Sequence, residues 1–535
     1  MKPFTLCRPF RFACAFILFV VSPSLHGQVY TDLFDFNSTT SGSNPLNPGL
    51  IAQGQDGNLY STLQSGGPKF GLGTVYVYQP GGTVNLLYNF DGTDGNGPMS
   101  GLSLGFDGNF YGATYLPHGS EQGEVFKITP SGTLTVLYPF ANGTDGGFPQ
   151  APPVQAPDGN LYGVTNGTIP TAYQISPSGS FKVLANLPSK TNAPLILGTD
   201  SNLYGTTVNG GTFNRGTAFQ LTTKGKLKII HNFNDPTGGL PVGPLMQASD
   251  GKLYGTTPWG GTSSGGVIYV MTTSGGGYKV LHNLSTTNVA EGSGSASGLV
   301  QGSDSFLYGA MPNGGANGLG TFFKINTTGT TYTVLHDFDK ATGSTPMSTP
   351  LLHTSGLIYG MTENSSKQGA LYSIDVGLQP FASLFVIWSG KVGTSVGIMG
   401  QGFNRATGVK FGTGLGSFTV VSDTYMTATA AAGATTGPAT VLEPGGNLVT
   451  PQMFKVIPTI SSFSPKSGPV GTLVTINGMS LKQTSSVTIG KAKAAFTVVS
   501  DTQVTATVGA GAVTGKVTLK TKGGTATGPG NFTVN

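Results

Sequence analysis

The chain has 535 residues, of which only 9% are charged, and 27 lysines and arginines stand against 22 aspartates and glutamates. A balance this close to neutral excludes a protein that binds nucleic acid through clustered cations. Glycine (85 residues) and proline (34) are abundant without a collagen period, which favours many short strands joined by turns.

The first 27 residues have the pattern of an export signal. Lys2, Arg8 and Arg11 precede an apolar run over residues 12–21 that is too short to span a bilayer. We therefore expect a secretory signal peptide (residues 1–27) with cleavage after Gly27, the alternative being a retained anchor helix. Localisation is expected to be secreted, extracellular or at the cell-envelope surface.

Both cysteines, Cys7 and Cys14, lie inside this segment. The expected mature chain therefore has no disulfide, no thiolate nucleophile and no cysteine metal site. Cys14 lacks the small-residue context of a lipobox and sits within the apolar run, so we expect no lipid anchor. No later segment reaches transmembrane length.

A repeat with a period near fifty residues follows. A tyrosine, mostly within Leu-Tyr-Gly, marks each of its seven copies: Tyr60, Tyr111, Tyr162, Tyr204, Tyr254, Tyr308 and Tyr359. This period accommodates four short strands and their turns, which is typical of a β-propeller blade rather than of a helical solenoid. Residues 28–378 are thus predicted to form a seven-bladed propeller.

Four strand-like pieces are expected in each repeat. A short apolar piece precedes a turn, which is led in six repeats by an aspartate: Asp56, Asp107, Asp158, Asp200, Asp250 and Asp304. The tyrosine strand comes second. The third strand carries an aromatic residue in its second position, predicted to be buried between blades: Tyr76, Phe126, Tyr173, Phe219, Tyr269, Phe323 and Tyr372. Its alternation predicts one packed face and a partly wetted opposite face.

A fourth strand follows the third strand in only six of the seven repeats, and the last repeat lacks one. A matching piece, 32–36, stands instead near the start of the mature chain. We expect it to pair with residues 371–374 and complete the last blade, because closing the ring removes two exposed sheet edges.

Two further units of about 78 residues end the chain. The sequence of 418–424 recurs unchanged at 496–502, and short alternating pieces with Gly/Pro turns surround both copies. Two small immunoglobulin-like β-sandwiches are therefore predicted, over residues 379–457 and 458–535. The predicted fold class is all-β.

Two family resemblances arise from these motifs. The stretch 460–478, with Ser-Pro-Lys-Ser-Gly-Pro-Val-Gly-Thr at its centre, resembles the opening of an IPT/TIG domain of cell-surface proteins. The first copy departs from it, with Ile387-Trp388-Ser389-Gly390 in place of the Ser-Pro-Lys-Ser-Gly motif. The seven repeats resemble the GloVer-type tandem repeats of secreted bacterial proteins. Neither resemblance implies catalytic residues.

No catalytic, cofactor-binding or metal-ligating residue is assigned from the sequence. His231, His282 and His336 fill one repeat position, which holds Phe34, Tyr88, Tyr138 or Ala185 elsewhere, so packing is favoured over a shared metal. His118 and His353 are isolated.

The acidic residues do not form a recognisable catalytic pattern either. The repeated aspartates are interpreted as turn formers rather than as a ring of acids. Segments 91–96 and 142–145 resemble calcium loops faintly but lack the terminal glutamate, so an ion there stays an open alternative. The repeat tyrosines are interpreted as packing between blades rather than as a sugar-stacking surface. The glutamates Glu121, Glu124, Glu291, Glu363 and Glu443 form no paired acid/base pattern.

The sequence thus predicts a non-enzymatic binding or scaffold protein. Its propeller would bind a glycan, peptide or protein, and its sandwiches would act as spacer or adhesion modules. The expected protein is a monomer without nucleic-acid partners or cofactors. The alternative is an extracellular polysaccharide hydrolase or lyase with its site in the propeller. Acids or histidines that break the repeat at the channel mouth would favour this enzyme.

Overall fold

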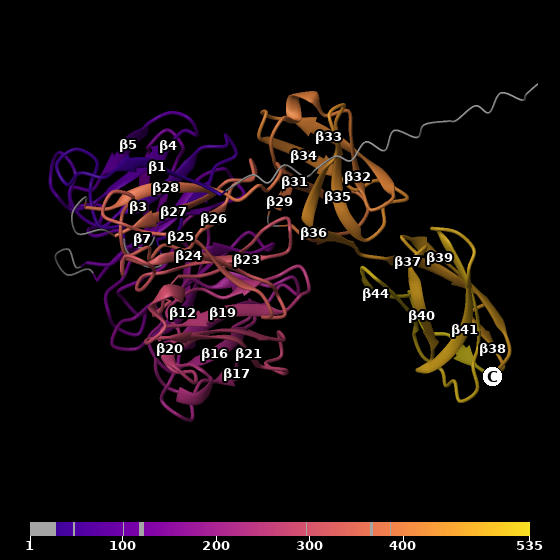
Figure 1. The fold of residues 1–535 in the computed structure, drawn as a ribbon. Helices are drawn as coiled ribbons and strands as arrows, with labels where there is room; N and C mark the ends of the chain where they lie inside the picture. The colour runs from indigo at the N-terminus through magenta and orange to yellow at the C-terminus, as the bar shows by residue number, and fades with distance from the viewer. Residues whose placement is uncertain are drawn as a thin grey trace, which may run out of the picture.

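The computed structural model describes residues 28–535 apart from 46–48, 100, 117–121, 296, 364–367 and 386. The expected signal peptide, His118 and Glu121 lie outside the described residues. The fold is all-β, with a seven-bladed propeller followed by two sandwiches, as predicted (Figure 1). Among the described residues, no helix has the length and apolar character needed to cross a membrane. Three short 3-10 turns are η1 (Asp235–Thr237), η2 (Val289–Glu291) and η3 (Phe403–Arg405).

Each of the first six blades is a sheet of four consecutive antiparallel strands. Blades 1 to 3 consist of β2 (Ala52–Gln53), β3 (Leu59–Leu63), β4 (Thr74–Tyr78), β5 (Val84–Asn89); β6 (Ser103–Leu104), β7 (Phe110–Thr114), β8 (Glu124–Ile128), β9 (Leu134–Pro139); β10 (Val154–Gln155), β11 (Leu161–Val164), β12 (Thr171–Ile175) and β13 (Phe181–Asn186). Blades 4 to 6 consist of β14 (Ile196–Leu197), β15 (Leu203–Thr207), β16 (Thr217–Leu221), β17 (Leu227–Asn232); β18 (Met246–Gln247), β19 (Leu253–Thr257), β20 (Ser264–Met271), β21 (Lys279–Ser285); β22 (Val300–Gln301), β23 (Leu307–Met311), β24 (Thr321–Ile325) and β25 (Tyr332–Asp337).

The seventh blade closes the ring with the N-terminal strand. β26 (Leu351–Leu352), β27 (Ile358–Thr362) and β28 (Ala370–Asp375) are completed by β1 (Val29–Asp35). β1 runs antiparallel to β28, with Tyr30 opposite Ile374 and Asp35 opposite Ala370. The predicted closure is confirmed, and the strand starts three residues earlier than expected.

The aromatic residues of the third strands are buried between neighbouring blades, as predicted. All seven are at most 1% exposed, and Phe219 of blade 4 packs in one cluster with Tyr162 of blade 3. The glycine of Leu-Tyr-Gly makes room for this ring: a Cβ on Gly205 would lie 2.6 Å from Phe219 Cζ.

The opposite face of the third strand is partly wetted, as predicted. In β16 this face carries Ala218, which is fully buried, and Gln220, which is half-buried. A blade is packed on both sides by its neighbours, so alternation along its inner strands is weaker than in a sheet with one solvated face.

Glutamine side chains link neighbouring blades around the channel. The Oε1 atoms of Gln155 and Gln247 accept hydrogen bonds from the backbone N–H groups of Phe106 (2.6 Å) and Thr199 (2.7 Å) in the preceding blade. Gln53 accepts a bond from Thr354 N in the same way across the ring closure (3.1 Å).

The two sandwiches repeat one topology. The first consists of β29 (Ser383–Phe385), β30 (Ser389–Gly390), β31 (Ser395–Met399), β32 (Gly408–Phe411), β33 (Gly414–Val420), β34 (Tyr425–Thr429), β35 (Gly437–Leu442) and β36 (Leu448–Val456). The second consists of β37 (Thr459–Ser464), β38 (Ser467–Gly468), β39 (Leu473–Met479), β40 (Thr484–Ile489), β41 (Ala492–Val498), β42 (Gln503–Thr507), β43 (Val517–Thr521), β44 (Gly524–Thr527) and β45 (Thr533–Val534). Each has its own apolar core. The divergent start of the first copy, β30, pairs in parallel with β36 just as β38 pairs with β45.

The first sandwich packs against one face of the propeller. Thr424 Oγ1 and Ser422 Oγ donate hydrogen bonds to the carbonyl oxygen of Gln55 in blade 1. Thr354 Oγ1 of blade 7 donates to the carbonyl oxygen of Gly400 (3.1 Å), and Lys455 Nζ donates to that of Thr199 in blade 4 (3.3 Å). These contacts involve the turns between first and second strands, so the sandwich covers the channel at that end.

Candidate binding site on the open propeller face

The opposite face of the propeller is formed by the loops between second and third strands. Because each second strand runs from the covered end to the other end of its blade, these loops lie away from the first sandwich. We call this surface the open face; its loops include residues 64–73, 165–170, 208–216 and 258–263.

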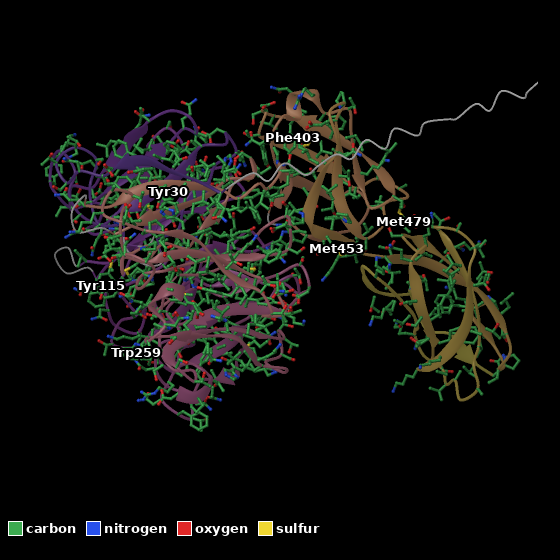
Figure 2. The ribbon with its side chains drawn as sticks, viewed as in Figure 1. Tyr30, Tyr115, Trp259, Phe403, Met453 and Met479 are labelled. Carbon is green, nitrogen blue, oxygen red and sulfur yellow. The ribbon has the colours of Figure 1, made fainter. Side chains whose placement is uncertain are left out.

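Large apolar side chains project from these loops. Trp259 is 60% exposed, Phe70 and Phe213 are each 55% exposed, and Ile169 is 37% exposed. Figure 2 shows Trp259 on the side of the propeller away from Phe403, which belongs to the first sandwich. Because several large apolar side chains are exposed on the loops of this one face, we take the open face as the candidate binding surface.

The backbone of Trp259 is fixed although its ring is exposed. Its carbonyl oxygen accepts hydrogen bonds from Gly239 N (2.8 Å) and Thr257 Oγ1 (2.9 Å). Gly260 follows with φ +82°, and a Cβ there would lie 2.5 Å from the carbonyl oxygen of Asp235. The backbone that carries the indole is therefore held in one conformation, which lowers the entropy lost on binding.

Two hollows flank the indole. The larger, of about 680 Å³, is lined by Arg215, Asp235 and Leu240, and the smaller, of about 270 Å³, by Thr286, Ser293 and Asn313 among others. Trp259 lines both, so an elongated ligand could cross its ring and reach hydroxyl and amide groups on either side.

An ion pair stands at the edge of the larger hollow. Arg215 Nε and Nη2 donate to Asp235 Oδ1 (2.5 Å) and Oδ2 (3.0 Å), and the two side chains are 44% and 62% exposed. Such an exposed pair adds little stability. It does hold a carboxylate and a guanidinium in fixed orientation, where their remaining hydrogen-bonding sites suit an uncharged polyol.

The repeated aspartates build turns, as predicted, and also hold the repeat tyrosines. In blade 4, Asp200 Oδ1 accepts a bond from Asn202 N (3.1 Å) and Oδ2 accepts one from Tyr204 OH (2.7 Å). Burial, together with the adjacent carboxylate, raises the pKa of Tyr204 to about 12, so its hydroxyl stays a donor. The same tyrosine–aspartate bond occurs at Tyr60–Asp56, Tyr111–Asp107, Tyr162–Asp158, Tyr254–Asp250 and Tyr308–Asp304.

The three repeat histidines pack against aromatic rings of the next blade, as predicted. His231 stacks on Tyr278 with ring centroids 3.9 Å apart, His282 on Tyr332 at 4.2 Å, and His336 on Tyr30 at 4.0 Å. They do not converge, and among the described residues no three metal-ligating side chains cluster.

Stability should depend on pH through His231. Burial lowers its pKa from 6.5 to about 4, so folding favours the neutral ring, and stability is lost as pH falls from about 6.5 toward 4. We expect His231→Phe to raise the melting temperature at pH 4 by several degrees more than at pH 7.5. An equal change at both pH values in thermal melts would contradict this account.

The segments considered as calcium loops are self-contained turns. Asp94 Oδ2 accepts a hydrogen bond from Tyr88 OH, and its Oδ1 accepts one from Asp91 N (3.1 Å). Asp145 is engaged in the same way by Ala141 N (2.9 Å) and Gly143 N (3.0 Å). Both carboxylates thus accept hydrogen bonds from residues that lie close to them in the chain.

The propeller channel has an apolar lining formed by the first strands. Prolines, leucines and other aliphatic residues such as Pro194, Leu195 and Met246 surround a space of about 390 Å³. The described residues that line it include no acid and no histidine. The feature that would have favoured a channel-mouth enzyme therefore does not occur among these lining residues.

Comparison of this sequence with models of protein families identifies the family of the chain. A model described as the Gloeobacter/Verrucomicrobia repeat matches residues 17–194 and 190–420. The chain belongs to the Gloeobacter/Verrucomicrobia repeat family. An IPT/TIG domain model matches residues 458–534, which is the second sandwich. No curated protein matches this Gloeobacter/Verrucomicrobia repeat protein.

Solved structures resemble parts of it at low identity. One is a gluconolactonase from Xanthomonas campestris (12% identity, 53% of this chain, 87% of that chain, TM-score 0.34). Another is a fungal alcohol oxidase in complex with copper (13%, 78%, 100%, TM-score 0.42). A third is a surface glycan-binding protein from Prevotella bryantii (13%, 28%, 41%, TM-score 0.23). With every TM-score below 0.5, these similarities carry no argument about the activity of this Gloeobacter/Verrucomicrobia repeat protein.

Trp259 was not among the candidates drawn from sequence, although a signal existed. The residue before the repeated Gly-Gly is polar in three copies, Ser65, Asn209 and Asn313, and is tryptophan only in the fifth. A break in the repeat at an exposed loop is where a Gloeobacter/Verrucomicrobia repeat protein can acquire a specific contact, since the scaffold does not require it.

Proposed function

We propose that this protein is an exported, non-enzymatic binding protein whose open face holds an uncharged glycan on Trp259. A propeller joined to an IPT/TIG domain fits a binding or scaffold role. The observation that supports the proposed glycan site is the 60% exposed indole of Trp259, which lines two neighbouring hollows.

The chemistry of the site suits a sugar. The C–H faces of a pyranose ring can lie on the flat indole, while its hydroxyls reach the side chains of Ser293 and Asn313 on one side and the Arg215–Asp235 pair on the other. A peptide strand would need an exposed row of backbone donors and acceptors, and an acidic ligand would need a free cation. Arg215 is already paired with Asp235.

The number and pairing of the acidic residues at these hollows favour binding over hydrolysis. Glycoside cleavage uses two carboxylates facing the same bond. Among the described residues lining the two hollows, Asp235 is the single carboxylate, and both its oxygens face Arg215. The sandwiches would then serve as spacers that present the open face.

A polysaccharide screen tests this function. We expect the protein of residues 28–535 to be retained by at least one of cellulose, chitin, xylan or starch, without release of new reducing ends. If the protein cleaves any of these polymers and Asp235→Asn abolishes that cleavage, the protein is a hydrolase and the proposed binding function is wrong. Export is checked separately by expressing all 535 residues. The intact mass of the secreted protein should then correspond to a chain that starts at Gln28 and carries no acyl group.

A further inference from the structure

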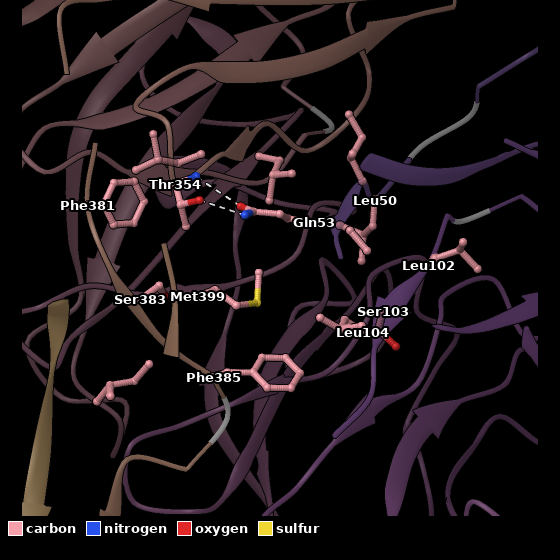
Figure 3. A pocket seen from close by; sticks show the side chains of 15 residues that line it. Leu50, Gln53, Leu102, Ser103, Leu104, Thr354, Phe381, Ser383, Phe385 and Met399 are labelled. Atoms are coloured by element: carbon pink, nitrogen blue, oxygen red, sulfur yellow. Dashed lines mark hydrogen bonds between the residues drawn. The ribbon is translucent and has the colours of Figure 1, made fainter. Parts of the chain in front are cut away.

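An apolar chamber lies between the propeller and the first sandwich. It combines the channel space of about 390 Å³ with an adjoining space of about 330 Å³, and both are lined by Leu50, Ser103 and Leu104. In the adjoining space, Phe385 and Met399 of the sandwich lie across from Leu104 of blade 2 (Figure 3). Each volume is within the range of about 300–1,000 Å³ of small-molecule sites.

The polar side chains of the propeller in this wall already have hydrogen-bond partners within the propeller. Gln53 Nε2 donates to Thr354 Oγ1 (2.8 Å), and Gln53 Oε1 accepts from Thr354 N (3.1 Å), as Figure 3 shows. Ser103 Oγ donates to the carbonyl oxygen of Pro153. No charged side chain lines either space among the described residues. The wall therefore rejects charged ligands, because a buried charge without a partner is strongly disfavoured.

Trp388 closes this chamber from the side of the sandwich. It is the one residue of the first sandwich that lines the channel space among the described residues. Its Nε1 is buried and does not face that space, so the side chain adds no exposed donor to the wall. Lys466 holds the equivalent position in the second sandwich, which has no propeller to face, so the tryptophan is particular to the copy at the channel.

We propose that this chamber binds an uncharged, mostly apolar small molecule. Its apolar walls select against ions and sugars, and its volume sets a small-molecule size. The chamber shares no lining residue with the two hollows beside Trp259. This proposal is therefore independent of the proposed glycan site.

The two tryptophans allow a direct test. Trp259→Phe leaves Trp388 as the single tryptophan of the chain, and its emission reports on the chamber. Titration with the neutral dye N-phenyl-1-naphthylamine should give saturable binding at one site, with dye fluorescence rising as Trp388 emission is quenched. Filling the wall with Ile196→Phe and Met246→Phe should weaken this binding by about tenfold or more.

Leu86→Phe, on an outer strand and 40% exposed, is the matched control and should leave dye binding unchanged. Thermal melts identify any variant that fails to fold, and Ile196→Phe alone then replaces the pair. Absence of saturable binding to the Trp259→Phe protein would overturn the proposal, as would equal binding to a folded variant with the filled wall.

Discussion

Removal of residues 28–37 should lower the melting temperature of the propeller by about 10 °C or more. This segment contains β1, which pairs along β28, and Phe36, which is only 2% exposed and packs on Tyr76 of blade 1. Its loss uncovers the edge of β28 and separates blades 7 and 1, and each kcal/mol lost shifts the melting temperature of a large domain by about 2–4 °C.

The matched control is Thr31→Ala, since Thr31 lies in β1 with an exposed side chain. It should melt within about 1 °C of the parent protein, because surface substitutions change stability little. Circular dichroism melts compare the three proteins. An unchanged transition after removal of residues 28–37 would contradict closure of the ring by β1.

Phe219→Ala should destabilise the propeller by about 3–5 kcal/mol, the usual loss for a large aromatic removed from a core. Phe219 is fully buried, and its cluster includes Leu195 of its own blade and Tyr162 of blade 3, so the cavity would open between two blades. The neighbouring Gly205 offers no side chain that could fill it.

Gln220→Ala, one position along the same strand, provides the comparison. Gln220 is half-buried and donates one hydrogen bond to Tyr204 OH (2.8 Å), so its loss should remove only about 0.5–1.5 kcal/mol. Urea unfolding followed by circular dichroism measures both changes. Equal losses would show that the strand faces have been assigned wrongly.

The architecture was accessible from sequence because its signals are local and repeated. The tyrosine period gave the blade count, and the missing seventh copy of the fourth strand led to β1, which the structure pairs with β28 as expected. Asp-led turns and the buried aromatic position recur in the same place of successive repeats, so periodicity reveals them.

Contacts that depend on side-chain geometry or on domain packing were less accessible. In six of the seven repeats the tyrosine hydroxyl donates to an aspartate four residues earlier, as in Tyr204 and Asp200, and composition does not reveal this bond. The covering of the channel by the first sandwich depends on how two separate domains pack. Only Trp388, where the first copy departs from the second, hinted at it. Trp259 gave a similar hint by breaking the repeat at the Gly-Gly loop.

The most direct test of the glycan-binding proposal compares Trp259→Ala with Phe70→Ala on the polysaccharide that retains the parent protein. Both side chains are exposed aromatics of the same face, at 60% and 55%, so neither change should alter the melting temperature. We predict that Trp259→Ala weakens retention by about tenfold or more, since aromatic anchors dominate binding energy, and that Phe70→Ala leaves it unchanged. Equal retention of Trp259→Ala and the parent protein, or no retention of the parent on any polymer, would contradict the proposal.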